Sequence, residues 1–400
     1  MIRSGKICFS LISNMIDEMM KNKNKNEEDD FQKKNNYIKC LSKTFSKFGG
    51  VLAKVSQILN LENEKSNVFA DCKPFSKNLT HDFFLEEILT KDEFNNVDID
   101  LLEVFNSGTI GQVYKCKYKN NDIIVKVQYE GLQEQTKQDL NILEKIISYL
   151  YNIENIYEII QTIKIKIEEE FNYTYELKNI NHIRELFNED VDIIIPNTYE
   201  EISSNNYISM DFLKGQLLST FILNSTQEEK NIVGSKIVKF IFKSMFVFNI
   251  LYSDCHYGNF LISDNLDLNI IDFGCIHYLD EELVNDIKTL YITLLNNDKY
   301  NFFMILEKLN IINDSISEES KEYSYEYFML QFEPLISDDF VFTDEWMLKS
   351  TFKNMNLMRE WVLPPNMVYF NKIPYGLYHI LNKLGLSISI KNIIENYILF

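Results

Sequence analysis

Residues 253–275 read SDCHYGNFLISDNLDLNIIDFGC and carry most of the recognisable chemistry of this chain. The carboxylate of Asp254 is followed five positions later by the carboxamide of Asn259, and a second carboxylate, Asp272, ends an apolar run. The apolar runs on either side of the SDNLD turn are β-prone, so they predict a short hairpin. Carboxylate and carboxamide oxygens at the end of such a hairpin are typical Mg²⁺ ligands.

Each of these motifs also has a plainer interpretation. The spacing between Asp254 and Asn259 fits a turn stabilised by Asx capping, and a lone Asp-Phe-Gly triplet arises often by chance. His256 could ligate a metal, but the chain has only five histidines, and a structural hydrogen-bonding role is favoured. The hairpin therefore needs support from elsewhere in the chain.

Two further elements lie upstream, in a second β-prone region. The loop NSGTIGQV separates two apolar runs, and its glycines would let backbone amides approach phosphate oxygens. Lys126 lies inside an apolar strand, where an inward-pointing ammonium group needs an anion. A plain hairpin turn and an edge-strand lysine facing water are the alternatives. The loop residues expected to contact a nucleotide are Gly108, Thr109, Gly111 and Val113.

The order of these elements along the chain is informative. A helical tract from about 134 to 187 carries Glu176, the candidate partner of Lys126, although a solvated helix face is the plainer interpretation of Glu176. Glycine loop, strand lysine, helix glutamate, DxxxxN and DFG follow one another as in the nucleotide site of protein kinases. There the lysine holds the α- and β-phosphates, and the Asn and DFG Asp hold Mg²⁺.

The chain resembles the ABC1 family of atypical kinases, also called UbiB or ADCK, over about residues 40 to 290. The matching segments are SDCHYGNFLI at 253–262 with HADPHPGNxLI, GQVY at 111–114 with SIGQVH, VKVQ at 125–128 with VAVKVQ, EFNYTYELKN at 170–179 with ExDYxxEAxN, and KVSQ at 54–57 with KxGQ. This combination is specific, since ordinary protein kinases lack the helical preface and the GNF continuation.

The resemblance implies an α+β, two-lobed, protein kinase-like fold. A small β-rich N-lobe with a helical N-terminal extension would precede a large helical C-lobe, and the cofactors would be ATP and Mg²⁺. The implied roles are Lys126 and Glu176 as an ion pair at the phosphates, Asp254 as the loop acid or base, Asn259 and Asp272 as Mg²⁺ ligands, and Lys54, Gln57 and Glu170 as a regulatory extension that limits access of protein substrates.

Several positions depart from the family pattern. Asn106 and the residues after it replace an alanine-rich loop, Ser56 replaces the KxGQ glycine, and Asn172 replaces the ExD aspartate. Cys255 and Tyr257 replace both prolines of the catalytic loop. All the metal-binding and phosphate-binding residues are nevertheless present, which argues against a dead pseudokinase.

The pattern along the chain predicts four segments. They are a flexible or targeting segment at 1–36, a helical extension of the KxGQ type at 37–100, a kinase-like N-lobe with inserted helices at 101–215, and a helical C-lobe at 216–400 that holds the catalytic loop and DFG. Further strands are expected at 193–195, 198–202 and 207–212. The residues after about 290 are helical and aromatic-rich, and the sequence assigns them no chemistry.

Composition limits the partners and the compartment. Of the 400 residues, 59 are Asp or Glu and 40 Lys or Arg, so the net charge of −19 disfavours nucleic acid and broad electrostatic docking on membranes. Six scattered cysteines without a CxxC pair indicate a reducing, intracellular compartment. Lys239 and Lys243 interrupt the most apolar stretch, so no transmembrane helix is expected. Secretion is not expected, a mitochondrial presequence stays open, and the cytoplasm is the alternative.

Three functional hypotheses follow. The leading one is an atypical kinase or ATPase that binds Mg·ATP and supports ubiquinone or isoprenoid-lipid metabolism, with lipid or membrane-surface contact through a local apolar patch. The second is an active protein Ser/Thr kinase, disfavoured because the segment after Gly274 runs quickly into a helix and lacks an APE element. The third is a non-catalytic, ATP-gated scaffold whose protein partner is unknown.

Overall fold

The computed structural model describes residues 99–107, 110–150, 156–351, 360–362, 364–367, 369–370 and 372–398. Residues 37–98 of the expected helical extension lie outside the described residues, and so do Lys54, Gln57, Gly108 and Thr109. The chain forms two compact units. The first consists of the chain up to Thr174 together with Tyr199–Asp211, and the second of Tyr175–Thr198 and Phe212–Phe400. The domain boundaries expected from the sequence stay a prediction.

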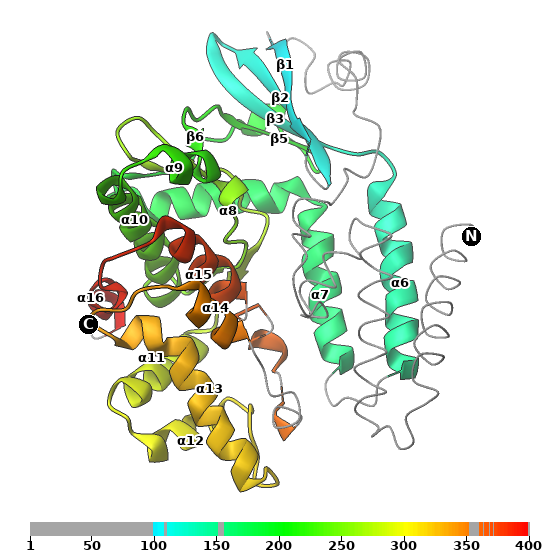
Figure 1. The fold of residues 1–400 in the computed structure, drawn as a ribbon. Coiled ribbons are helices and arrows are strands. Elements are labelled where there is room, and N and C mark those ends of the chain that lie inside the picture. Colours follow the sequence, from blue (N-terminus) through cyan, green and yellow to red (C-terminus); the bar gives the residue numbers. More distant parts are fainter. Residues whose placement is uncertain are drawn as a thin grey trace, which may run out of the picture. The chain divides into compact units, whose positions relative to one another are not determined.

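An antiparallel sheet forms the body of the first unit (Figure 1). Its strands, in spatial order, are β1 (Ile99–Ser107), β2 (Gly111–Tyr118), β3 (Asn121–Gln128) and β5 (Tyr207–Asp211). Alternate residues of β2 and β3, such as Tyr114, Cys116, Ile123 and Val125, are fully buried, as the period of a strand requires. Lys119 and Asn120 take positive φ angles of 48° and 67° and make the two-residue turn between these strands.

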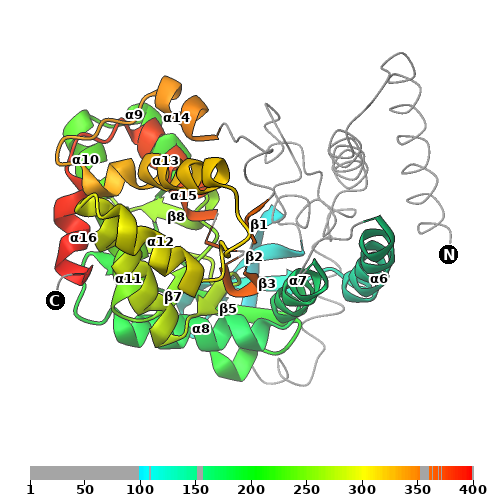
Figure 2. The ribbon, with the colours of Figure 1, turned by 90° about the horizontal axis from the view of Figure 1, so that it is seen from below.

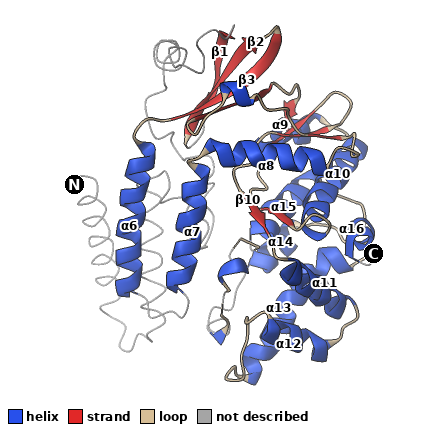
Figure 3. Cartoon of the chain, turned by 180° about the vertical axis from the view of Figure 1, so that it is seen from behind, coloured by secondary structure: helices blue, strands red, loops and turns tan. Residues whose placement is uncertain are grey.

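Two helices follow β3 in the sequence. α6 (Leu132–Leu150) and α7 (Ile156–Glu170) lie side by side as a hairpin (Figures 1 and 3). The Lys164 ammonium group ties them together, lying 2.8 Å from Glu144 Oε2, and Gln161 donates to the same carboxylate. The helical tract is also expected to break near residues 152–155, which lie outside the described residues.

The second unit is mainly helical. Its α-helices are α8 (Tyr173–Leu186, of which the first two residues belong to the first unit), α9 (Leu218–Asn224), α10 (Gln227–Phe246), α11 (Glu281–Leu295), α12 (Lys299–Lys308), α13 (Glu318–Ile336), α14 (Asp344–Thr351), α15 (Lys372–Leu384) and α16 (Ile390–Ile398). α11, α12 and α13 pack against one another (Figure 2). α10 packs on α15, α16 and the short strand β7 (Ile250–Tyr252), so it forms the centre of this unit. A capping box of Thr226 and Glu229 begins α10.

Short strands connect these helices and flank the loop from Asp254 to Asn259. β8 (Phe260–Ile262) and β9 (Leu268–Ile270) form the expected hairpin, flanked by β4 (Ile193–Ile194) and β6 (Gln216–Leu217). A separate pair is formed by β7 (Ile250–Tyr252) and β10 (Ile276–Tyr278). The 3-10 turns are η3 (Glu200–Ile202), η4 (Tyr257–Asn259) and η6 (Pro365–Met367).

Two local expectations were wrong. The apolar pattern predicts a helix that ends near Tyr252, but α10 ends at Phe246, because Asn249 turns the chain with a φ of 55° into β7. The expected strand at 198–202 is largely the turn η3. Both errors involve segments of a few residues, too short for periodicity to separate strand, helix and turn. The segment after Gly274 runs quickly into a helix, as expected, since α11 begins at Glu281 after the short strand β10.

Within the described ranges, every helix is too short or too polar to cross a bilayer. This agrees with the expectation from the lysines of α10. Those lysines instead take part in an ion-pair network.

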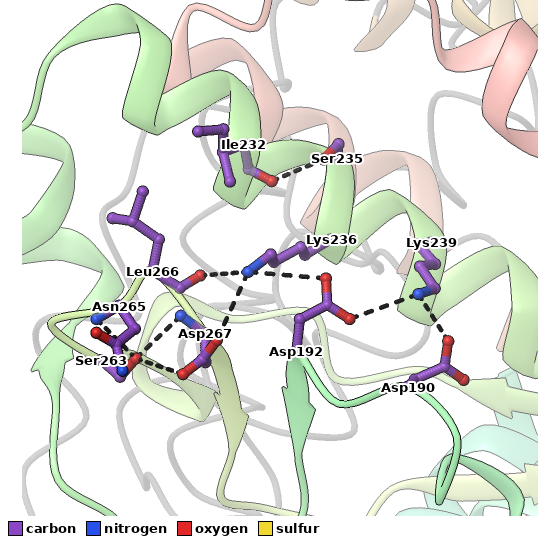
Figure 4. A network of polar contacts seen from close by, with 10 residues as sticks. All are labelled: Asp190, Asp192, Ile232, Ser235, Lys236, Lys239, Ser263, Asn265, Leu266 and Asp267. Atoms are coloured by element: carbon purple, nitrogen blue, oxygen red, sulfur yellow. Dashed lines mark hydrogen bonds and ion pairs between the residues drawn. The ribbon is translucent and has the colours of Figure 1, made fainter.

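Figure 4 shows the part of this network that involves Lys236 and Lys239 of α10. Lys239 Nζ lies 2.6 Å from Asp190 Oδ1, and Lys243 Nζ lies 2.6 Å from Asp190 Oδ2. Lys236 donates to the carbonyl oxygen of Leu266 at 2.8 Å. Burial alone would raise the pKa of Asp190, but hydrogen bonds from Lys239 and Lys243 outweigh burial and hold that pKa below its ordinary value. The network joins α10 to the turn before β4 and to the β8–β9 hairpin.

Asp190→Asn is expected to lower the free energy of unfolding at pH 7 by about 2 kcal/mol, between the values typical of exposed and of buried ion pairs. Because the pKa of Asp190 is depressed in the folded state, its stabilisation is present above about pH 4 and is lost as the pH falls through the folded value. Urea unfolding at a series of pH values should show a constant difference from the parent down to about pH 5, and a shrinking one below about pH 4. The exposed Asp264 serves as control, and equal losses in Asp264→Asn and Asp190→Asn would contradict the assignment.

Candidate nucleotide and metal site

The β8–β9 hairpin brings the two expected Mg²⁺ ligands together. Asn259 directly precedes β8, and Asp272 lies two residues after β9. The amide of Ile271 donates to the carbonyl oxygen of Asn259 at 3.1 Å, so Asp272 follows a residue hydrogen-bonded to Asn259. The Asn259 side chain donates through Nδ2 to the carbonyl oxygen of Asp254 at 2.9 Å and to its Oδ2 at 3.0 Å. All three residues therefore lie in one part of the second unit.

The backbone around Asp272 is held by a buried tyrosine. The Tyr252 hydroxyl donates to the carbonyl oxygen of Asp272 at 2.9 Å, and the amide of Gly274 donates to Asp272 Oδ1 at 3.0 Å. Burial, with smaller contributions from the charges of Asp272 and Asp254, raises the pKa of Tyr252 well above its ordinary value. The phenol therefore stays protonated and keeps its role as a donor.

Helix α8 holds the next residue, Phe273, by both of its backbone groups. The Asn179 side chain donates through Nδ2 to the carbonyl oxygen of Phe273 at 3.1 Å, and Oε1 of the buried Glu176 lies 3.5 Å from the Phe273 amide. Glu176 and Asn179 are one helical turn apart, so they face the same segment. The Tyr278 hydroxyl donates to Asn179 Oδ1 at 3.0 Å. These contacts fix the segment that carries Asp272.

No pattern in the sequence predicted the roles of Tyr252 and Asn179. Tyr252 stands where the family signature begins with histidine, and Asn179 is the last residue of the ExDYxxEAxN match. Position within a motif was therefore the only available indication, since hydrogen bonds to distant backbone atoms leave no periodic pattern. His256 has the structural contact that was favoured for it, because its Nδ1 accepts from the Gly258 amide at 3.1 Å.

The donor atoms present fit a Mg²⁺ ion that arrives with a nucleotide. Nδ2 of Asn259 donates its hydrogen bonds to Asp254, so the oxygen Oδ1 of the same carboxamide group takes no part in those bonds. No described residue donates a hydrogen bond to Oδ1. The described residues contain no group of three or more His, Cys, Asp or Glu side chains suited to hold a metal by themselves. Mg²⁺ commonly takes one or two protein oxygens and completes its octahedron with phosphates and water.

The first unit contains the residues expected at the phosphates. Lys126 pairs across the sheet with Val113 on β2, and both are half-buried on the face opposite the fully buried side chains of these strands. Gly111 begins β2, where a Cβ would lie 2.4 Å from the carbonyl oxygen of Val127 and 2.9 Å from the Tyr173 hydroxyl. Close backbone approach within the sheet thus requires glycine at 111, whatever its part in binding phosphate.

Two acidic residues fall in different units. The half-buried Glu170 ends α7 in the first unit, whereas Glu176 belongs to the second. The ion pair between Lys126 and Glu176 therefore stays a prediction, as does the role of Glu170. Asn172, which replaces the family's aspartate, accepts through Oδ1 from the amide of Thr174 at 3.1 Å and so caps the start of α8.

Asn179→Ala is expected to speed amide exchange of residues 271–276 and to lower the free energy of unfolding by about 1–2 kcal/mol, because it leaves the Phe273 carbonyl without this donor. Hydrogen-exchange mass spectrometry and urea unfolding would measure both effects. Tyr278→Phe is the matched control, since it removes only the hydroxyl that donates to Asn179 from a largely exposed ring. Equal effects of the two variants would contradict the role given to Asn179.

Known proteins resemble this chain over most of its length. Residues 70–305 match the ABC1 atypical kinase-like domain. The mitochondrial atypical kinase COQ8 of Saccharomyces cerevisiae is 21% identical over 374 residues, which cover 88% of this chain and 74% of that protein. The probable serine/threonine-protein kinase abkB of Dictyostelium discoideum is 27% identical over 274 residues, which cover 64% of this chain but only 40% of that protein.

A solved structure shares the fold. Rv3197 of Mycobacterium tuberculosis, solved in complex with erythromycin, superposes with a TM-score of 0.65 at 17% identity and covers 87% of this chain and 92% of that one. The kinase-like α+β fold expected from the sequence is thereby confirmed. The match to the family domain covers more than half of the 400 residues. The chain belongs to the ABC1 atypical kinase family.

Proposed function

We propose that this chain is an atypical kinase or ATPase that binds ATP together with Mg²⁺. The observation that carries the proposal is the arrangement of Asp254, Asn259 and Asp272 in one hairpin, with Asn259 hydrogen-bonded to Asp254 and joined through the backbone to the residue before Asp272. Lys126 would hold the α- and β-phosphates, and Glu176 would pair with it. The family membership supports the same assignment.

Each residue of the hairpin would have a distinct chemical part. The Asp254 carboxylate, oriented by the Asn259 amide, would accept the proton of an attacking hydroxyl group or water molecule. Asn259 Oδ1 and the Asp272 carboxylate would hold the metal. Bound Mg²⁺ would neutralise charge that develops on the phosphates. The Tyr252 hydroxyl and the Asn179 side chain would keep the Asp272 segment in place without touching substrate.

The segment after Gly274 favours a small acceptor over a protein substrate. β10 begins at Ile276 and pairs with β7, and α11 begins at Glu281. The chain between the DFG triplet and α11 is thus short and held in a β-pair, which leaves no extended segment for a peptide to dock against. This disfavours the alternative of an active protein Ser/Thr kinase, although the Dictyostelium relative carries that name.

The family suggests a setting for this activity. The names of the yeast and Caenorhabditis elegans relatives place those proteins in mitochondria, and we propose a mitochondrial location for this chain, with the cytoplasm as the alternative. Support of ubiquinone or isoprenoid-lipid metabolism follows from the resemblance to the UbiB group. Because the net charge is −19, lipid or membrane-surface contact would need a local apolar patch.

Mg·ATP at about a hundred times its dissociation constant is expected to stabilise the parent chain by roughly 2.7 kcal/mol, seen as a higher thermal midpoint. Asp272→Asn and Lys126→Ala should reduce the shift, because each removes a charge that faces the nucleotide. Asp264→Asn, in the turn of the same hairpin, is the matched control and should keep the full shift. A parent chain without any shift would disprove nucleotide binding, and a full shift in both site variants would place the nucleotide elsewhere.

Asp254→Asn is expected to keep the thermal shift with Mg·ATP but to lower the rate of ATP hydrolysis or phosphoryl transfer by roughly 10²–10⁴-fold, the usual loss on removing a general base. Phosphate release from radiolabelled ATP would measure it. Binding by the parent without any turnover, equal in the Asp254→Asn variant, would instead support the ATP-gated scaffold.

A further inference from the structure

The C-terminal part of the second unit contacts the proposed catalytic loop, which begins at Asp254. The residues after about 290 contain no motif that indicates such a role. Helix α15 and Tyr369 make three contacts here. Two are with the loop itself, and the third is with a residue that hydrogen-bonds to Ser253, directly before the loop. These contacts involve Cys255, Tyr257 and His277, the last of which lies on β10. Cys255 and Tyr257 flank His256 within the loop that begins at Asp254. The contacts are therefore concentrated on the loop that carries the proposed acid or base.

The first contact brings backbone against backbone. A Cβ on Gly376 of α15 would lie 2.6 Å from the carbonyl oxygen of Cys255 and 2.9 Å from the Cys255 Cβ. Atoms do not approach one another so closely, so any larger residue at 376 would force α15 and the loop apart. Cys255 itself is buried, with 7% of its surface exposed. Gly376 thus lets α15 lie directly on the residue after Asp254.

The second contact is made by Tyr257. Its hydroxyl donates to the carbonyl oxygen of His379 on α15 at 3.3 Å, and the two rings meet edge to face with centroids 5.7 Å apart. Burial raises the pKa of Tyr257 above its ordinary value, so the hydroxyl remains a donor at neutral pH. The ring therefore links the first residue of η4 to α15.

The third contact acts through a buried pair. The His277 ring lies against Tyr369 with centroids 3.9 Å apart, and its Nε2 is 3.0 Å from the hydroxyl of Ser253. Ser253 and His277 are both buried, which excludes solvent from this hydrogen bond. Ser253 directly precedes Asp254. The loop is therefore supported on both sides of the proposed acid or base.

The loop backbone has the conformation that proline would impose at 257. His256 has φ −128° and ψ 146°, the extended region that a residue before proline prefers. Tyr257 is the first residue of the 3-10 turn η4, a position where proline is favoured, and no described residue accepts a hydrogen bond from its amide. The family signature has proline at both 255 and 257. This chain keeps the backbone shape there without that covalent restriction.

We propose that helix α15, together with Tyr369, positions the catalytic loop. Gly376 and Tyr257 are the positioning residues, and they replace the backbone restriction that the two prolines of the family signature would impose. The catalytic meaning of this support rests on the proposed function, since Asp254 and Asn259 belong to the supported loop. The support itself is a property of the folded chain and can be measured without a nucleotide.

Amide hydrogen exchange of the ligand-free, full chain tests the proposal, read on peptides that span 253–262. Gly376→Ala and Tyr257→Ala should speed exchange there by about 2- to 10-fold, the range expected for one hydrogen bond and its packing. Tyr257→Pro should return exchange towards the parent rate, because proline restores the restriction in a backbone already compatible with it. Peptides from α11 should be unchanged in all three variants, which shows that the unit is still folded.

Gly234→Ala is the matched control. A Cβ at 234 would meet the tip of Leu386 at 2.4 Å, so it disturbs helix packing in the same unit at a flexible side chain rather than at the loop. Parent-like exchange of 253–262 in both Gly376→Ala and Tyr257→Ala would overturn the proposal. Equal acceleration in Tyr257→Ala and Tyr257→Pro, or in Gly234→Ala, would overturn it too.

Turnover of Mg·ATP by the same variants separates this proposal from the proposed function. If the parent hydrolyses ATP, Gly376→Ala and Tyr257→Ala should lower kcat with little change in the thermal shift by Mg·ATP, and Tyr257→Pro should recover part of kcat. If the parent neither binds nor hydrolyses ATP, the proposed function fails, whereas the exchange rates still decide whether α15 supports the loop.

Discussion

The hydrogen bond from the amide of Ile271 to the carbonyl oxygen of Asn259 is the interaction on which the candidate site depends. β8 and β9 pair over only three residues each, so their ends would splay without it. This bond extends the ladder by one step beyond Phe260 and brings the carboxamide of Asn259 next to the chain that leads into Asp272. The proposed metal site would need this geometry, because both side chains must reach the same ion.

Side chains from distant parts of the sequence then hold the segments that carry Asn259 and Asp272. Tyr252 and Asn179 bond the backbone of residues 272 and 273, and α15 lies on the loop between Asp254 and Asn259. None of these supporting groups is proposed to touch a nucleotide. They act by limiting the positions open to groups that would, which is how enzymes pre-organise charge for phosphoryl transfer. The aromatic-rich C-terminal helices thereby acquire a physical connection to the loop.

Local sequence patterns predicted the strands and turns that depend mainly on interactions between residues close together in the sequence. β-prone runs separated by turn residues predicted β2, β3 and the β8–β9 hairpin, and ordered motifs predicted the kinase-like fold. β7 and β10 were missed because a segment of three residues is too short to show a period, and these two strands pair with each other. Tyr252, Asn179 and Gly376 contact residues far away in the sequence. Local patterns in a single sequence do not indicate which distant segments lie in contact. Lys54, Gln57, Gly108 and Thr109 lie outside the described residues, so their roles stay predictions.

The central claim is that Asn259 and Asp272 bind a divalent cation jointly with the phosphates of a nucleotide. Electron paramagnetic resonance of Mn²⁺, a common substitute for Mg²⁺, tests it directly by measuring the bound and unbound ion in a titration. The account predicts that the chain alone binds Mn²⁺ weakly. With ATP added, Mn²⁺ should bind more tightly than it binds to ATP without the chain, and Asp272→Asn should lose this gain in affinity. Tight Mn²⁺ binding without nucleotide, or an undiminished gain in Asp272→Asn, would contradict it.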